Sequence, residues 1–286
     1  MRPTTKTKLF CVLATPASDL GGVLYNAGFE SLNEDAVYLP LSTTELPAMV
    51  AALRTLRFSG AAVSMPYKEA ILPLLDHLDP DAQAIGAVNT VVMRDGAFHG
   101  HNTDWYGAVQ ALKEETRIKG KSVLLIGAGG AARAIAFGIV KEGGELTIVN
   151  RSPAAGEKLA TLHQAAFLPL SEVRSVEEFE IVINGTSVGF REPEQPPPVP
   201  TVFHPGQIVM DVVFTPLETQ LLRAAAAANA VPIPGTKMLA YQARMQFDLW
   251  LGRHPELTVL ERALIDALQH QLARPVPPKA EGSTRF

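Results

Sequence analysis

The feature that most constrains the fold is a glycine-rich turn between a short β-branched run and a long helical pattern. Residues 122–127 have the length of a buried strand, residues 129–144 follow as a helix, and 145–150 form the next strand. The turn places Gly127, Gly129 and Ala132 in the spacing GxGxxA. Such glycines let the backbone approach a pyrophosphate at the helix N-terminus. The pattern favours a dinucleotide-binding βαβ unit; the alternative is a glycine turn that serves backbone geometry alone.

The end of the second strand indicates which dinucleotide would bind. An NAD site usually carries a carboxylate there for the ribose hydroxyls. This chain has Asn150, Arg151 and Ser152 at that point. A guanidinium is suited to a 2′-phosphate, so we expect NADP, with NAD less favoured. The alternative is that Arg151 is an ordinary surface residue.

The same alternation of strand and helix patterns continues along the chain and indicates parallel sheets with crossover helices. Strands are predicted at 8–14, 36–41, 60–65, 122–127, 145–150, 180–185 and 207–214, and helices at 21–31, 44–57, 104–116, 129–144, 153–163, 236–252 and 256–273. Asp95-Gly96 between two apolar runs predicts a hairpin. The proline-rich segment 191–200 is expected to be a loop, and 275–286 a frayed tail.

Composition excludes several classes of protein. A length of 286 residues predicts two domains, and 47% hydrophobic residues exclude a disordered chain. A formal charge of −4 argues against nucleic-acid binding, and no apolar run is long enough to span a membrane. The single cysteine, Cys11, fits a reducing compartment and is expected to be an inert core thiol. We therefore expect a cytoplasmic protein, either a monomer or a homodimer.

Four further motifs point to one family. They are VSMPYK at 63–68, GAVNT at 86–90, GHNTD at 100–104 and GTKMLAYQA at 235–243. Together with the glycine turn, Asn150-Arg151, NGTS at 184–187 and Asp211, they resemble the shikimate dehydrogenase family in the family's order. The resemblance spans about residues 8–272. The combined set is specific, although no single motif is.

The resemblance implies the fold and the division of the chain. It implies an N-terminal mixed α/β substrate domain and a Rossmann-type NADP-binding domain, with the active site in the cleft between them. We expect residues 1–104 and about 240–286 to form the first domain and 105–239 the second. It also implies reversible hydride transfer between the nicotinamide and a ring alcohol or ketone.

The resemblance further assigns residues to roles. Lys68 and Asp104 match the family's catalytic pair, and a general base is needed because the hydroxyl proton must leave with the hydride. Taken singly, Lys68 reads as a solvated lysine and Asp104 as an N-cap. Asn89 and Gln242 match positions that bind ring hydroxyls, Ser64 replaces the usual threonine, and Tyr67 receives no role. The cofactor contacts implied are Gly127, Ala128, Gly129, Gly130, Ala131, Asn150, Arg151, Ser152, Thr186, Val212, Gly235 and Met238; no metal ligand is assigned.

One loop departs from the family pattern. The family carries two serines, in a form like SxSP, that hold the substrate carboxylate. Aligned on Tyr25-Asn26, those positions are Asp19 and Gly21 here, and the proline is Gly22. Two like charges about 4 Å apart cost roughly 4 kcal/mol at an effective dielectric near 20, more than the ~1 kcal/mol of a lost hydrogen bond.

Three explanations of this loop stay open. Ser18 supplies a hydroxyl from one residue away while Asp19 turns to solvent. Alternatively, the loop binds a non-carboxylate or amino-bearing substrate. The third possibility is that Asp19 only caps the next helix.

Two more departures lie near the expected cleft. Phe214 stands where the family has tyrosine, which removes a hydroxyl and leaves an apolar wall. Lys237 adds a cation that would pair with cofactor phosphates, with Asp19, or with water alone.

The leading hypothesis is therefore an NADP-dependent oxidoreductase acting on shikimate and 3-dehydroshikimate. The alternatives are a dehydrogenase of quinate or of a related non-carboxylate or amino-substituted ring alcohol, and a non-catalytic NADP-binding sensor.

Overall fold

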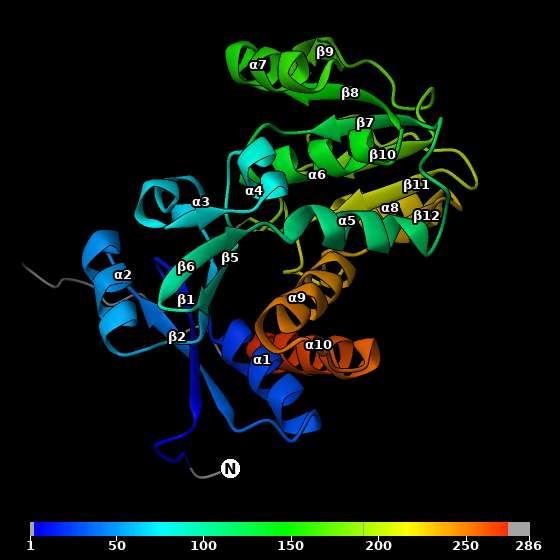
Figure 1. The fold of residues 1–286 in the computed structure, drawn as a ribbon. Helices are drawn as coiled ribbons and strands as arrows, with labels where there is room; N and C mark the ends of the chain where they lie inside the picture. Colours follow the sequence, from blue (N-terminus) through cyan, green and yellow to red (C-terminus); the bar gives the residue numbers. More distant parts are fainter. Residues whose placement is uncertain (1–2, 191, 274–286) are drawn as a thin grey trace, which may run out of the picture.

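A computed structural model describes residues 3–190 and 192–273 and divides them between two α/β units, each built on its own sheet (Figure 1). The first sheet has the order β2-β1-β3-β5-β6-β4. β1 is parallel to β2 and β3, whereas β5 runs antiparallel to both β3 and β6, which makes the sheet mixed. Its strands are β1 (Lys8–Ala14), β2 (Ala36–Ser42), β3 (Gly60–Val63), β4 (His77–Leu78), β5 (Thr90–Arg94) and β6 (Ala97–His101).

The second sheet is doubly wound. Its order is β12-β11-β10-β7-β8-β9, and every neighbouring pair is parallel. The strand order reverses between β7 and β10, and ligands of open parallel sheets bind outside the carboxyl ends of the strands at such a point. Its strands are β7 (Ser122–Ile126), β8 (Glu145–Asn150), β9 (Ala166–Pro169), β10 (Ile181–Asn184), β11 (Ile208–Asp211) and β12 (Val231–Ile233).

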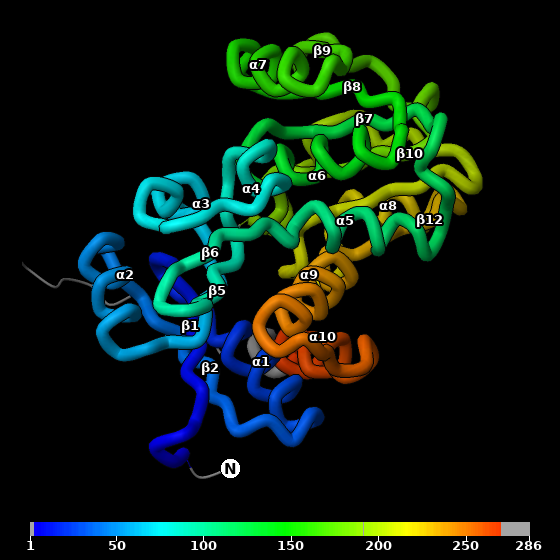
Figure 2. The backbone as a smooth tube through the Cα atoms, viewed as in Figure 1, coloured from blue at the N-terminus to red at the C-terminus, as the bar shows by residue number. Residues whose placement is uncertain are grey.

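Helices cover both sheets, and the last two return to the first (Figures 1 and 2). α9 and α10 pack on α1 in one apolar cluster that contains Phe10, Tyr25, Phe247 and Leu260. The α-helices are α1 (Asp19–Ser31), α2 (Leu46–Thr55), α3 (Tyr67–Ala70), α4 (Pro80–Ile85), α5 (Asp104–Lys113), α6 (Gly130–Lys141), α7 (Pro153–His163), α8 (Gln220–Ala227), α9 (Gly235–Leu251) and α10 (Leu257–Ala273).

Most predicted elements are present, and the differences concern short ones. The hairpin is confirmed: Asp95 and Gly96 have φ of 52° and 81°, as a tight primed turn requires. The sequence did not predict six short elements, namely β4, β9, β12, α3, α4 and α8. Of these, β9 and β12 are strands of four and three residues that each contain a proline. Residues 192–200 contain no helix or strand, as expected, whereas residue 191 and the tail 274–286 lie outside the described residues. In the described part of the chain, no helix is long and apolar enough to cross a membrane.

The two units meet where α5 leaves the first sheet. α5 packs along α9 so closely that a Cβ on Gly107 would lie 2.5 Å from the Met238 carbonyl oxygen. On the other side of α5, Trp105 joins Ile85, Ala87 and Ala134 in a small apolar cluster that α4 and α6 share. Two exposed ion pairs also bridge the units, Arg133–Glu69 at 3.1 Å and Lys141–Asp81 at 2.8 Å. These contacts fix the relative placement of the sheet edges that carry the site.

Candidate active site

A lysine–carboxylate pair lies where the two units meet. Lys68 belongs to α3, which follows β3, and Asp104 is the first residue of α5. Lys68 Nζ lies 2.6 Å from Asp104 Oδ2, and the two side chains are 18% and 2% exposed. The second carboxylate oxygen, Oδ1, accepts a hydrogen bond from Asn89 Nδ2 at 2.8 Å. Lys68 is therefore not a solvated lysine, and it keeps N–H donors for a further partner because an ammonium has three.

Local backbone contacts hold this pair in place. The Val88 N–H donates to the Lys68 carbonyl at 2.8 Å, which ties α3 to the segment before β5. Asn102 Oδ1 accepts from the Asp104 N–H at 3.0 Å, while Asn102 Nδ2 donates to the Ala87 carbonyl. Thr103 occupies the N-cap position of α5 without a side-chain capping bond. The N-cap interpretation of Asp104 is therefore wrong, since both of its carboxylate oxygens are committed to side chains.

Asn89 lies beneath the pair rather than beside open space. It is 1% exposed, and its two amide hydrogens go to Asp104 Oδ1 and to Thr103 Oγ1 at 2.9 Å. Its Oδ1 accepts from the Thr103 N–H at 2.8 Å and from Thr90 Oγ1 at 2.7 Å. All of its polar groups are thus satisfied within the protein. In this structure Asn89 holds Asp104, and a ring hydroxyl would have to replace one of these bonds to reach it.

Ser64 and Gln242 lie on segments next to those that carry the pair. Ser64 directly follows β3, is half-buried, and its N–H donates to the Leu13 carbonyl at 2.9 Å. Gln242 is half-buried on α9, and its Cβ lies 3.1 Å from the position that a Cβ on Gly107 would occupy. Because Gly107 is one turn after Asp104, Gln242 faces the same end of α5 as the pair.

The glycine turn faces Lys68 across the boundary between the units. Gly127 has φ of 114°, a conformation open to glycine, and its N–H donates to the Val149 carbonyl at 2.7 Å. A Cβ on Gly129 would meet nothing within 4 Å, so the N-terminus of α6 opens onto free space. A Cβ on Gly130 would lie 3.7 Å from Lys68 Cδ. The turn therefore has room for a pyrophosphate and lies next to the lysine–carboxylate pair.

The remaining residues proposed for the cofactor differ in how much surface they offer. Arg151 and Ser152 are exposed at the end of β8, and Asn150 Nδ2 donates to the Ser152 carbonyl at 2.9 Å. Ala128, Ala131, Thr186 and Val212 are half-buried. Gly235 is buried, because a Cβ there would lie 2.6 Å from the Val212 carbonyl oxygen, and Met238 is 6% exposed in the core of the second unit. An exposed guanidinium beside an open glycine turn fits a phosphorylated dinucleotide.

The atypical loop begins α1. Ser18 is the N-cap, and its Oγ accepts from the Leu20 N–H at 3.2 Å. Asp19 is exposed in the first turn, where a carboxylate interacts favourably with the helix dipole. The interpretation of Asp19 as the cap is therefore wrong. A Cβ on Gly21 would lie 3.2 Å from Tyr38 Cε1 and 3.5 Å from its Oη, so the Tyr38 ring fills the space of a serine side chain.

The two other departures have structural partners. Lys237 Nζ lies 2.8 Å from Glu114, the C-cap of α5, and 2.9 Å from Glu261 of α10. The sequence did not predict either of these two partners for Lys237. Burial would lower the pKa of Lys237, but its bonds to Glu114 and Glu261 outweigh this and raise it. Phe214 packs against the apolar cluster of α1 and α9, with its ring 5.8 Å from that of Phe190.

Sequence reasoning missed a set of buried polar residues around the pair. Gln246 is fully buried and bonds to the backbone of Asn89 and to the hydroxyl of Thr90. Tyr25, to which the sequence assigns no role in the site, donates its hydroxyl hydrogen to Gln246 Oε1. One signal was available, because Gln246 lies one helical turn after Gln242 and so shares its face.

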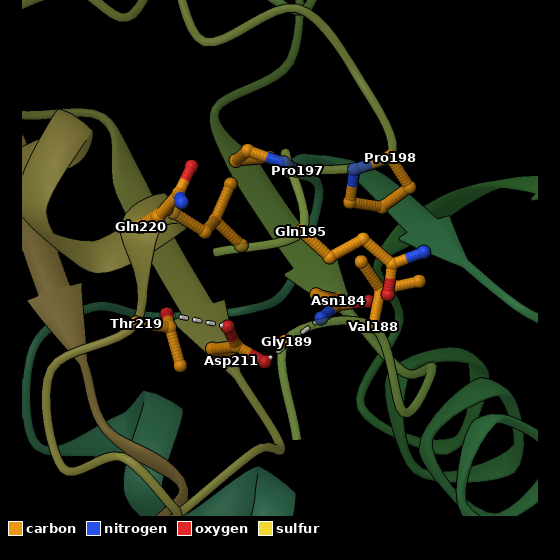
Figure 3. A pocket seen from close by; sticks show the side chains of 10 residues that line it. Asn184, Val188, Gly189, Gln195, Pro197, Pro198, Asp211, Thr219 and Gln220 are labelled. Atoms are coloured by element: carbon orange, nitrogen blue, oxygen red, sulfur yellow. Dashed lines mark hydrogen bonds between the residues drawn. The ribbon is translucent and has the colours of Figure 1, made fainter. Parts of the chain in front are cut away.

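A small pocket lies elsewhere, at the carboxyl ends of β10 and β11 (Figure 3). Asp211 accepts from Asn184 Nδ2 at 2.9 Å and from Thr219 Oγ1 at 2.7 Å, and Pro197 and Pro198 also line the pocket. Burial raises the pKa of Asp211, although its hydrogen bonds oppose the shift. None of the lining residues is among those predicted for catalysis or cofactor binding. These bonds hold the loops that follow the two strands.

The second unit has a doubly wound sheet with an open glycine turn, and this turn lies against the lysine–aspartate pair of the first unit. This arrangement defines a two-domain dinucleotide-dependent oxidoreductase. Family models match three stretches of the chain. Residues 18–91 match the shikimate dehydrogenase substrate binding domain, 109–189 match shikimate / quinate 5-dehydrogenase, and 235–265 match the shikimate 5′-dehydrogenase C-terminal domain.

Whole-chain relatives agree with these matches. A shikimate dehydrogenase (NADP(+)) of Syntrophobacter fumaroxidans is 39% identical over 280 residues, covering 93% of this chain and 96% of that protein. The shikimate 5-dehydrogenase of Thermus thermophilus in complex with NADP(H) and shikimate is 34% identical, with a TM-score of 0.83 over 91% of this chain and all of that one. The ligand-free 5-ketofructose reductase of a Gluconobacter species is 32% identical, with a TM-score of 0.85 over 92% of this chain and all of that one. The chain belongs to the shikimate dehydrogenase family.

Proposed function

We propose that this protein is an NADP-dependent dehydrogenase that interconverts a ring alcohol and its ketone, with shikimate and 3-dehydroshikimate as the first pair to test. The observation that carries the proposal is the position of the Lys68–Asp104 pair. The Asp104 side chain of this pair is buried, and the Lys68 side chain extends to the glycine turn, where its Cδ lies 3.7 Å from the position that a Cβ on Gly130 would occupy. A sensor that only binds NADP has no need of such a pair.

The pair would manage the proton of the reaction. The chemistry that NADP supplies when bound is the acceptance and donation of hydride. When a carbinol carbon loses hydride, its hydroxyl proton must leave as well, and in ketone reduction a proton must return to that oxygen. Lys68 Nζ and Asp104 Oδ2 are 2.6 Å apart, so a proton can pass between the two atoms. Asn89 keeps Asp104 Oδ1 hydrogen-bonded throughout and thereby leaves Oδ2 to Lys68.

A second substrate class is supported by the loop that begins α1. The Ser18 oxygen accepts the cap bond and leaves one hydroxyl hydrogen to donate, but Tyr38 fills the space beside Gly21, and Asp19 adds an exposed negative charge. A carboxylate would gain little from such a loop, whereas a neutral polyhydroxy ketone or an amino-bearing ring would not be repelled. The similarity to a 5-ketofructose reductase points in the same direction.

We propose further that residues 1–104 and about 240–286 form the substrate domain and 105–239 the cofactor domain. The packing of α9 and α10 on α1 supports this division. The proposed substrate contacts are Ser64, Asn89, Gln242, Ser18 and Asp19, with Asn89 exchanging its bond to Thr103 Oγ1 for a substrate oxygen while it keeps its bond to Asp104. The single cysteine supports a cytoplasmic location, and size-exclusion chromatography with light scattering would distinguish a monomer from a homodimer.

The test follows NADPH absorbance with two matched substrate groups, shikimate and quinate against carboxyl-free cyclohexane alcohols and ketofructoses. We expect turnover in at least one group, and a loss of about a hundredfold or more in kcat for Lys68→Ala and Asp104→Asn. Lys119→Ala, at an exposed lysine between α5 and β7, is the control and should retain full activity. Tight NADPH binding without turnover of any substrate would refute the enzymatic proposal.

The substrate class is tested by the charge on the loop. If a carboxylate binds near Asp19, Asp19→Asn removes a repulsion and raises kcat/KM for shikimate and quinate while leaving neutral substrates unchanged. If the substrate is an amine, the same change lowers kcat/KM for the amine. A parent protein that already prefers shikimate to every neutral compound would remove the second substrate class.

A further inference from the structure

A buried chain of hydrogen bonds runs from α1 to the Lys68–Asp104 pair, and Gln246 lies at its centre. Gln246 is on α9 and has 0% exposure. Its Nε2 donates to Thr90 Oγ1 at 2.7 Å and to the Asn89 carbonyl at 3.2 Å. Its Oε1 accepts from the hydroxyl of Tyr25. Burial raises the pKa of that hydroxyl, and the nearby negative charge of Asp104 raises it further, so Tyr25 stays a donor.

The direction of donation is fixed along the whole chain. Because Gln246 Nε2 donates to the Thr90 oxygen, the Thr90 hydrogen is directed to Asn89 Oδ1, which lies 2.7 Å away. The Thr103 N–H donates to the same Asn89 oxygen. Asn89 must therefore present its Nδ2, and not its carbonyl oxygen, to the Asp104 carboxylate. The reversed amide would place an oxygen against Asp104 Oδ1, which would lose its donor, and would turn an NH2 group toward the Thr103 N–H.

Apolar packing alone does not require a polar side chain at this position of α9. Ala243 and Phe247, on the same face of α9, are fully buried in an apolar cluster. A glutamine buried among them loses its hydrogen bonds to water, and only well-formed hydrogen bonds within the protein offset that cost in free energy. Those bonds lead to Asn89 and Thr90 and to nothing else besides Tyr25 within the described residues.

We propose that Gln246 is a positioning residue for Asp104. It holds the backbone of Asn89 directly and the Asn89 amide through Thr90, so that Asp104 Oδ1 stays hydrogen-bonded and Oδ2 stays aimed at Lys68. Gln246 does not contact the substrate. The inference rests on the proposed function, in which the Lys68–Asp104 pair moves the proton.

The experiment compares variants that cut this chain with one that does not. Gln246→Met and Thr90→Val remove the donors and should lower kcat about ten- to a hundredfold while leaving KM for NADPH unchanged. Thr90→Ser keeps the hydroxyl and should retain the kcat of the parent protein. The double variant Gln246→Met/Thr90→Val should lose no more than the worse single variant, because both cut the same chain.

Trp250→Phe is the matched control. Trp250 Nε1 donates to the Val91 carbonyl at 3.0 Å, so it forms the same kind of α9-to-β5 bond without reaching Asn89. Trp250→Phe should lower the thermal midpoint as Gln246→Met does, yet keep kcat. A kcat that follows stability in all variants, including Trp250→Phe, would overturn the proposal, as would an unchanged kcat in Gln246→Met.

A second measurement keeps the proposal testable if no substrate is turned over, which would be a failure of the proposed function alone. In ¹⁵N-labelled protein, the Asn89 side-chain amide protons are expected to exchange slowly and to lose this protection in Gln246→Met but not in Trp250→Phe. Asn89→Asp identifies the resonance. Equal protection in both variants would refute the positioning role.

Discussion

The contact between α5 and α9 gives the sharpest prediction, and Gly107→Ala perturbs it. The added Cβ would lie 2.5 Å from the Met238 carbonyl oxygen, whereas ordinary contact begins at 3.4 Å. The helices must therefore separate by about 0.9 Å. Overpacking of this kind costs about 1–3 kcal/mol, and the helix preference of alanine returns about 0.5–1 kcal/mol. We expect a net loss of up to about 2.5 kcal/mol in the free energy of unfolding.

Turnover should suffer more than stability. Asp104 is carried by α5 and Gln242 by α9, so the separation displaces one from the other by close to 1 Å. A misplacement of that size costs about a hundredfold in rate. Urea unfolding and NADPH-linked kcat measure the two effects. Gly22→Ala is the control for stability, since its Cβ would lie 3.7 Å from Pro40 Cδ and should stabilise α1. A Gly107→Ala protein with unchanged kcat would refute this reasoning.

Three further predictions concern charge and reactivity. Burial opposes the ionisation of Glu114, but its bonds to Lys237 and Tyr241 lower its pKa below 4.5. Glu114→Gln should therefore reduce the free energy of unfolding by about 0.5–1 kcal/mol near neutral pH. Thermal melts at decreasing pH should show this difference vanish as the pH falls through the lowered pKa of Glu114. Arg151→Ala should raise KM for NADP about tenfold or more and leave KM for NAD unchanged; an equal change for both cofactors would contradict the 2′-phosphate role. Cys11 is fully buried with its pKa raised to about 12, so a thiol reagent should modify it only as fast as the protein unfolds.

The fold was predictable wherever one periodic signal dominated. The glycine turn, its flanking strands and the Asp95-Gly96 hairpin follow from backbone conformations that few residues adopt. The short strand β12 was not predictable, because Pro232 argues against a strand and only its edge position beside β11 allows it. Its existence depends on a neighbouring strand that lies well before it in the sequence.

The candidate site was predictable in its charged pair but not in its support. Lys68 and Asp104 belong to motifs, whereas Gln246 gains its meaning only when α9 packs on β5. Lys237 illustrates the opposite error. Its sequence neighbours suggested a place in the cleft, but its partners are Glu114, at the C-terminal end of α5, and Glu261 of α10. Side-chain partners from distant elements cannot be read from spacing along one element.

The crossing of the chain between its two units has a mechanical consequence. The chain passes from the first sheet to the second at α5 and returns at α9, and these helices are in contact at Gly107 and Met238. Asp104 lies at the start of that crossing. When two bodies rotate relative to each other, the distances between their atoms change least near the axis of rotation. If the units rotate about this contact, Lys68 and Asp104 stay together because both are anchored to the first sheet, while Gly130 swings away from Lys68. The axis of opening would then pass beside the proton-handling pair, so that cofactor exchange need not disassemble it.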